Sequence, residues 1–160
     1  MTKFEVTYRE NYRKMFCVAH KVVGDKDVVS DIVQEVFVSY YEKLQNRHAI
    51  NRPNSWLLRA VINKSVDYVN QQKKYVRLDA IQDNKEEDII DKHQSEAVMQ
   101  QALRRLNHQE MELVVLYSES FSYKEIAQIT GIRFSSVGKT LSRSLNKLKE
   151  ILKKMDDEMY

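Results

Sequence analysis

Apolar residues recur every three or four positions along most of this chain, a period that predicts helices rather than strands. In the first half we expect helices over about Val6–Val23, over about Asp27–Gln45, and from Ser55 to about Lys74. The second of these has regular apolar pairs with polar residues between them, which predicts one broad buried face. Gly24 can end the first helix, and Pro53 bends the loop before the third.

The second half begins with two further helical patterns. We expect a helix over Ser95–Leu106, and Asn107 followed by Glu110 predicts the capped start of the next helix. The expected buried side of that next helix consists of Met111, Val114, Val115 and Tyr117.

The most informative stretch is a short helix followed by a tight turn and a long last helix. Ser122 and Glu125 form a capping-box pattern, Gly131 can end the short helix, and Ser135 can cap the last one. Two helices joined by a tight turn with Gly are typical of a helix-turn-helix, whose second helix enters the DNA major groove. The exposed side of the last helix carries hydroxyl and basic side chains that can contact phosphates or base edges: Ser136, Lys139, Thr140, Arg143 and Lys147.

Composition supports an all-α fold. The 160 residues include three Gly and one Pro, which leaves little turn chemistry for a β-sandwich or barrel. Hydrophobic residues make up 42% of the chain, enough to fill a core. The net charge of +3 is too small to indicate a nucleic-acid partner by itself.

The distribution of charge along the chain changes that picture. The net charge is +5 over residues 1–74, −4 over residues 75–100 and +2 over residues 101–160. The acidic middle lacks a sustained apolar stripe, which predicts a solvated linker; an acidic segment with a partner of its own is the alternative. We therefore predict two small helical domains, residues 1–75 and 95–155, joined by a flexible acidic linker over 76–94 and followed by an acidic tail over 156–160.

Several classes of protein are disfavoured by what the sequence lacks. Cys17 alone cannot form an internal disulfide, and the single Cys and four His have no usual zinc-ligand spacing. No stretch approaches the roughly 18 apolar residues of a membrane span. There is no Gly-rich phosphate loop and no His-Glu-x-x-His pattern. We expect a cytoplasmic protein that is not an enzyme and needs no cofactor or metal.

Taken together, the motifs resemble those of a small bacterial RNA polymerase sigma factor of the extracytoplasmic-function group. The resemblance covers about Tyr8 to Leu152 and preserves the order of the motifs. Its specificity lies in their combination, because a helix-turn-helix occurs in many regulators. The residues that carry it are Asp31-Ile32-Val33-Gln34-Glu35-Val36-Phe37, Trp56-Leu57-Leu58-Arg59, Asn63, Asp67-Tyr68, Ser122-Tyr123-Lys124-Glu125-Ile126-Ala127 and Gly131-Ile132.

The resemblance implies a promoter-specificity subunit of RNA polymerase, with three sets of contact residues. The helix that carries Asp31, Gln34 and Glu35 is expected to dock on the clamp helices of the largest polymerase subunit, and the family also contacts the polymerase flap. The −10 promoter element, melted, is expected to contact Arg52, Arg59, Asn63, Lys64, Lys73 and Lys74. The −35 element, as duplex, is expected to contact Ser135, Ser136, Lys139, Thr140, Arg143 and Lys147. The family is commonly held inactive by an anti-sigma factor, so we expect such a partner as well.

Two features qualify the resemblance. Gly138 stands at a recognition-helix position where the family often has Lys or Arg, and Gly costs a helix interior about 0.5–1 kcal/mol. Tyr40, Tyr41 and Trp56 fall on buried stripes, so we interpret them as core residues.

The alternative function is a free-standing helix-turn-helix regulator that acts as a dimer, for which the tail Lys147–Met155 is the one candidate dimerisation helix.

Overall fold

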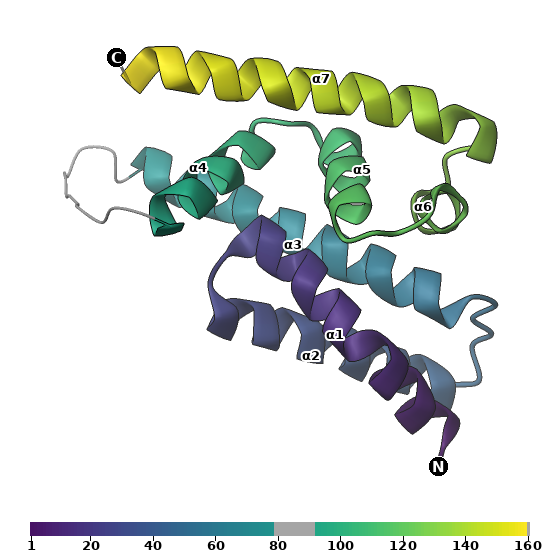
Figure 1. Cartoon of the computed structure of the whole chain (residues 1–160). Coiled ribbons are helices and arrows are strands. Elements are labelled where there is room, and N and C mark those ends of the chain that lie inside the picture. The colour runs from purple at the N-terminus through teal and green to yellow at the C-terminus, as the bar shows by residue number, and fades with distance from the viewer. Residues whose placement is uncertain (79–91, 160) are drawn as a thin grey trace.

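The protein is described here by a computed structural model that covers residues 1–78 and 92–159. Within those residues the chain forms α-helices and no strand, which confirms the all-α expectation (Figure 1). The helices are α1 (Lys3–Val23), α2 (Lys26–Gln45), α3 (Pro53–Leu78), α4 (Lys92–Arg104), α5 (His108–Ser118), α6 (Tyr123–Thr130) and α7 (Phe134–Met159).

Helices α1, α2 and α3 form an N-terminal bundle. Asp25 caps α2 by accepting from the backbone N–H groups of Asp27 and Val28. Gly24 ends α1 with a φ of 91°, a conformation that residues with a side chain rarely adopt. The buried residues of the bundle are mostly β-branched or aromatic: Val18, Val22, Val29, Val33, Val36, Phe37, Tyr40, Val61, Ile62 and Val69.

Helices α5, α6 and α7 form the expected helix-turn-helix unit, with α4 packed against α7. The Glu125 N–H donates to Ser122 Oγ at 3.1 Å, and the Ser122 N–H donates to Glu125 Oε1 at 2.9 Å, so the predicted capping box is present. Gly131 ends α6 in the left-handed conformation, with φ 82° and ψ 2°. The helix-turn-helix prediction is therefore confirmed.

Three local expectations were wrong. Ser135 does not cap the last helix, because α7 begins one residue earlier, at Phe134. Tyr117 is 47% exposed, since the last turn of α5 emerges from the packed unit after Leu116. Tyr41 is 48% exposed although its neighbour Tyr40 is fully buried, because adjacent residues on a helix point about 100° apart.

Most of the expected linker over residues 76–94 lies outside the described part of the chain. Helix α3 runs on to Leu78 and α4 begins at Lys92, while residues 79–91 lie outside the described part of the chain. Three residues of the expected acidic tail, Asp156–Glu158, continue α7 as exposed helix. No helix within the described residues is both long enough and apolar enough to span a membrane.

The two halves pack against each other in this structure. Helix α6 lies against α3, and α4 and α5 lie against α1 (Figure 1). The Lys21 ammonium is 3.2 Å from Glu119 Oε2, and Arg104 Nη2 donates to the carbonyl oxygen of Val23 at 3.0 Å. These contacts bring the loop and helix expected to bind the −10 element next to the helix-turn-helix unit.

Asn11 fixes the start of α3 on α1, and this contact yields a first prediction. The Asn11 amide is 1% exposed and donates to the Thr7 carbonyl at 2.9 Å and to Asn54 Oδ1 at 2.8 Å. Asn11→Ala should lower the free energy of unfolding by about 1–2 kcal/mol, because the buried amide and its hydrogen bonds to α1 and to the start of α3 are lost. Urea denaturation measures the change. The exposed neighbour Glu10→Ala is the control and should change stability by less than about 0.5 kcal/mol; equal effects of the two changes would contradict the structural role of Asn11.

Candidate nucleic-acid and polymerase interfaces

A pocket lies at the junction of the two halves, beside the first turn of α3. Pro53 is the first residue of α3, a position where its missing N–H breaks no helical hydrogen bond. The Trp56 ring packs 6.1 Å from the Tyr40 ring between centroids, and Lys43 Nζ lies 5.9 Å from the centre of the Trp56 ring. These contacts hold the indole at the pocket wall.

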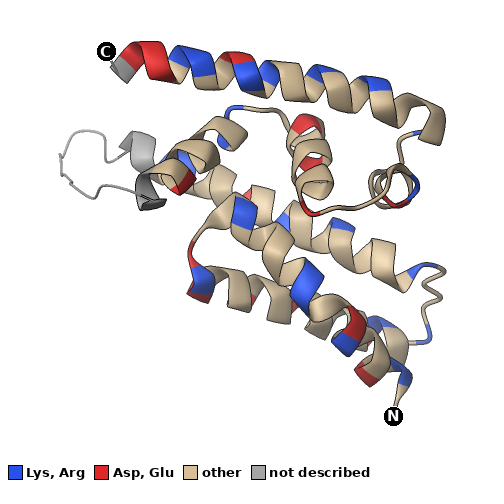
Figure 2. Ribbon diagram, in the orientation of Figure 1, with Lys and Arg blue, Asp and Glu red and all other residues tan. Residues whose placement is uncertain are grey.

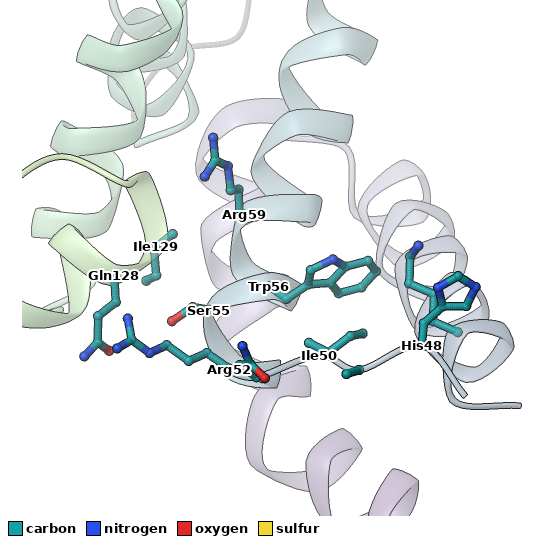
Figure 3. Close-up of a pocket in the computed structure, with 11 residues that line it drawn as sticks. His48, Ile50, Arg52, Ser55, Trp56, Arg59, Gln128 and Ile129 are labelled. Atoms are coloured by element: carbon teal, nitrogen blue, oxygen red, sulfur yellow. The ribbon is translucent and has the colours of Figure 1, made fainter. Parts of the chain in front are cut away.

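The pocket has basic and polar groups on one side and α6 on the other (Figure 3). Arg52, Ser55 and Arg59 line it from the loop and α3, and Gln128 and Ile129 line it from α6. Arg52 extends toward Gln128 in Figure 3. The arrangement suits an anionic ligand with a flat apolar part, since guanidinium groups bind phosphates and aromatic rings stack on bases.

Of the six residues expected at the −10 element, Arg52 and Arg59 line this pocket and the other four lie elsewhere along α3. Arg52 and Arg59 share the pocket, whereas the half-buried Asn63 lies further along α3 and does not line it. Lys64 is on another side of α3, where its ammonium is 3.4 Å from Glu35 Oε2. Lys73 donates to the Arg104 carbonyl at 2.6 Å, and Lys74 is exposed.

The three residues expected at the polymerase share a groove between α2 and α3. Asp31, Gln34 and Glu35 are exposed and line it together with Val38 and Lys64. The Lys64–Glu35 contact thus links a residue predicted for DNA to one predicted for polymerase. Because both side chains are largely exposed, this ion pair adds little stability and can be exchanged for other partners.

The first turns of α7 carry most of the residues expected at the −35 element. Ser135, Ser136, Lys139 and Arg143 are exposed, and Figure 2 shows basic residues spaced along α7. The Thr140 hydroxyl is already engaged, because it donates to the Ser136 carbonyl at 2.8 Å. These positions lie on the outer side of the unit, opposite the buried Val137 and Leu141.

Lys147 lies far along α7 from the other residues expected at the −35 element, and it has a carboxylate partner within the protein. At 1.5 Å per residue it lies about 18 Å along α7 from Ser135. Its ammonium is 3.0 Å from Glu110 Oε1, the carboxylate that also accepts from the Asn107 N–H in the capping box of α5. Burial raises the pKa of the Glu110 carboxyl, but the hydrogen bonds from Asn107 and Lys147 and the Lys147 charge outweigh it and lower the pKa.

Gly138 lies beside the ring of Tyr123. A Cβ built on Gly138 would lie 3.4 Å from Cε2 of Tyr123, which is an ordinary contact distance. Tyr123 is 42% exposed, so its ring lies at the surface next to Gly138. The backbone of Gly138 is ordinary helix, so its conformation does not require glycine.

Glu112 is a charged residue that sequence inspection missed. It lies inside the continuous buried run Met111–Leu116 of α5 and is 8% exposed. Burial raises the pKa of the Glu112 carboxyl to about 7, and the positive charge of Arg59 opposes that rise. His108 Nε2 is 3.7 Å from Glu112 Oε1. The sequence signal for this buried carboxylate is one acidic residue, Glu112, within the apolar run Met111–Leu116. That signal does not reveal that Arg59, in the other half of the chain, lies near it.

An N-terminal helical bundle with a cationic pocket, followed by a helix-turn-helix with an exposed basic helix, defines a DNA-binding transcription protein of two units. The family model for sigma-70 region 2 matches residues 7–75, and that for sigma-70 region 4 matches residues 97–148. The chain therefore belongs to the sigma-70 family and is a sigma factor of the extracytoplasmic-function group.

Sequence relatives agree with this assignment. The chain is 24% identical over 168 residues to the ECF RNA polymerase sigma factor SigE of Mycolicibacterium smegmatis, covering 99% of this chain and 65% of that relative. It is 25% identical over 155 residues to the RNA polymerase sigma factor SigV of Bacillus subtilis, covering 92% and 89%. This chain thus spans just under two thirds of the SigE relative and most of SigV.

Solved structures share the fold. The sigma factor RpoE from Bartonella quintana, in complex with the anti-sigma factor NepR, has a TM-score of 0.63 at 19% identity, covering 96% of this chain and 98% of that one. CnrH in complex with the cytosolic domain of CnrY has a TM-score of 0.66 at 20% identity, covering 94% and 88%.

The buried Glu112 predicts an unusual pH dependence of stability. Its folded pKa of about 7 lies above the ordinary 4.5, so the wild type should lose stability as the pH rises from about 4.5 through 7. Glu112→Gln should therefore be more stable than wild type by about 1–2 kcal/mol at pH 8, after allowing for partial screening by water, and equal to it near pH 4.5. Urea denaturation at both pH values measures this.

Glu110→Gln is the control for Glu112→Gln. The folded pKa of Glu110 is lowered, so its ionised form stabilises the fold above the ordinary pKa, and that contribution is lost as the pH falls. The Glu110→Gln variant should therefore be less stable than wild type at pH 8. The same sign for both variants at pH 8 would contradict the structural account of Glu112, in which burial outweighs the charge of Arg59.

The two glycines of the helix-turn-helix should respond oppositely to alanine. Gly138→Ala should raise the free energy of unfolding by about 0.5–1 kcal/mol, because Gly138 has helical backbone and the new Cβ meets Tyr123 at ordinary contact distance. Gly131→Ala should lower it by about 1 kcal/mol, because φ is +82° there. Thermal or urea denaturation of both variants measures the signs; a destabilising Gly138→Ala would show that the Tyr123 contact is tighter than described.

Proposed function

We propose that this sigma factor binds core RNA polymerase through the groove between α2 and α3 and directs initiation by holding promoter DNA at two places. The observation that carries the proposal is the pairing, in one chain, of the Arg52–Arg59 pocket in region 2 with an exposed basic recognition helix in region 4. A protein with two separate DNA sites and a third, acidic face has the surfaces that a promoter-specificity subunit needs.

The pocket beside α3 is suited to a strand of melted −10 DNA. Unstacking a base costs a few kcal/mol, which contacts to the flipped base and to the backbone must offset. Arg52 and Arg59 supply charge for the phosphates, and Trp56 and Ser55 supply a ring and a hydroxyl. Asn63, Lys73 and Lys74 lie further along α3 and can contact the strand beyond the pocket, whereas Lys64 must first leave Glu35.

The start of α7 is suited to duplex DNA of the −35 element. In a helix-turn-helix, the N-terminal residues of the second helix contact base edges. Lys139 and Arg143 can read guanine or bind phosphate, and Ser135 and Ser136 can bind either. Thr140 and Lys147 have partners within the protein, so their contribution requires an exchange of those partners for phosphates.

The polymerase contact is supported by charge and exposure. Asp31, Gln34 and Glu35 form an exposed, mainly acidic patch on α2 that no neighbouring helix of the described structure buries. Polymerase acts on DNA in the cytoplasm, so we expect the protein there. Two structural relatives are complexes with, respectively, an anti-sigma factor and the cytosolic domain of CnrY, which supports a regulatory protein partner for this chain too.

The packing of α7 disfavours a free-standing dimeric regulator. The apolar residues of the candidate dimerisation tail pack within the molecule: Leu148 and Met155 are buried, and Ile151 and Leu152 are partly buried against the same core. Helix α7 contacts α4 along this stretch. No continuous apolar stripe is therefore left on this tail for a second copy.

Transcription in vitro tests the proposal. Purified protein should direct core polymerase to a subset of promoters in a genomic library. Arg59→Ala should weaken dependence on the −10 element and Arg143→Ala dependence on the −35 element, each by roughly 5-fold to 100-fold, because each removes one charged DNA contact. Asn63→Ala should reduce −10 selectivity in the same assay.

The control for these variants is Arg9→Ala, an exposed arginine of α1 outside all three surfaces. It should leave both promoter dependences unchanged. Indifference of transcription to both Arg59→Ala and Arg143→Ala would overturn the residue assignments, and failure of the wild type to co-elute with core polymerase would overturn the function.

A further inference from the structure

We propose that the pocket between α3 and α6 also binds a free small molecule, of the class of nucleoside monophosphates. The site is built from residues of both halves of the chain, and its size suits one nucleotide. The inference goes beyond promoter binding, although Arg52 and Arg59 belong to both sites. It is carried by the charge, the lining and the volume of the pocket.

The pocket gathers positive charge that no carboxylate pairs with. Lys43, His48, Arg52 and Arg59 line it, and no acidic residue of the described chain does. Within residues 1–78 and 92–159 none of these four side chains forms an ion pair, whereas lysines of α1, α3 and α7 pair with glutamates elsewhere. Glu112 attracts Arg59 but does not line the pocket. Such a cluster suits a phosphate, which guanidinium groups bind through charge-assisted hydrogen bonds.

The same pocket offers apolar surface to a flat ring. Ile50 and Trp56 line it from the loop and the start of α3, and the buried Ile129 lines it from α6 (Figure 3). The indole of Trp56 is held against the fully buried ring of Tyr40. Aromatic side chains stack on any nucleobase, because every base has a π face. A ring beside unpaired guanidinium groups therefore favours a nucleotide over a simple anion.

Uncharged polar groups complete the lining. Asn51 and Ser55 lie on the side of α3, and Gln128 lies on the side of α6. Their amide and hydroxyl groups form no hydrogen bond with the part of the chain that the structure describes, and all three side chains are at least partly exposed. They are free to donate to and accept from the edge of a base or the hydroxyls of a sugar.

The volume of the pocket sets the size of the ligand. At about 380 Å³ it falls within the range of small-molecule sites, roughly 300–1,000 Å³, which occur preferentially where domains meet. Arg52 extends toward Gln128 across the pocket (Figure 3). A nucleotide in contact with both would link the loop before α3 to α6. It should therefore stabilise the folded chain against heat, because it binds the native state only.

Trp56 makes the test direct, because it is the only tryptophan of the chain. Adenosine monophosphate is the probe, and it is titrated into the full chain while the indole is excited at wavelengths that the nucleotide does not absorb. We expect saturable quenching, together with a higher melting temperature at saturating nucleotide. Inorganic phosphate and adenosine each offer one part of the probe, and both should bind at least about tenfold more weakly.

Four variants locate the bound nucleotide. Arg52→Ala should weaken binding roughly tenfold or more, because it removes a charged donor to the phosphate. Gln128→Ala should weaken it roughly threefold to tenfold, because it removes a hydrogen bond from α6. The matched controls are Arg9→Ala on α1 and Gln109→Ala on α5, whose side chains are exposed and lie outside the pocket. Both controls should keep the affinity of the wild type.

The outcomes separate nucleotide binding from the proposed function. Titration without saturable quenching would overturn the nucleotide site, and so would equal affinities for adenosine monophosphate and inorganic phosphate. An affinity unchanged in Gln128→Ala would overturn it too, because α6 would then take no part. If no nucleotide binds while promoter selectivity still responds to Arg59→Ala, the proposed function stands alone. Nucleotide binding that depends on Arg52 and Gln128, with transcription indifferent to Arg59→Ala, would support the nucleotide site and overturn the −10 assignment of Arg59.

Discussion

The structure depends on one constraint, which is that the long helix α3 has to serve as core and as surface at once. One side of it, from Leu57 to Val69, is buried and holds α1 and α2 together. Its other sides are polar, and two of them meet different neighbours: Lys64 faces Glu35 of α2, and Arg59 faces the helix-turn-helix unit. A substitution on the buried side of α3 therefore affects stability, whereas one at Lys64 or Arg59 affects a particular contact.

The buried side of α3 and its polar sides make different kinds of contact. Within each half the helices are joined by buried aliphatic and aromatic residues, which pack closely and resist separation. Between the halves the apolar cluster continues, and ion pairs and hydrogen bonds to carbonyl groups are added to it. The Glu112 carboxyl of α5 is poorly solvated and only partly compensated by the charge of Arg59, so its ionised form costs stability.

Sequence patterns predicted the features that depend on neighbours along the chain. Ser122, Glu125 and Gly131 fix their helix ends through bonds to residues three or four positions away, so the helix-turn-helix could be predicted closely. Features that depend on contacts between distant segments were not predictable. Nothing in the sequence pairs Lys64 with Glu35 or sets Glu112 near Arg59. The prediction that Tyr117 and Tyr41 are buried was wrong for the same reason. A helical pattern shows which residues share a face of a helix, but it does not show where a neighbouring helix ends.

The capping boxes of this protein affect how the chain folds while it is being translated. Thr2 with Glu5, Asn107 with Glu110 and Ser122 with Glu125 each close a helix start within three residues. Such starts can form as soon as their own segment leaves the ribosome, before a packing partner exists. All contacts among α1, α2 and α3 lie within residues 3–78, so the N-terminal bundle can fold while the helix-turn-helix is still being translated. The nascent chain would then expose the side of α3 that α6 contacts in the finished protein until synthesis of the second half is complete.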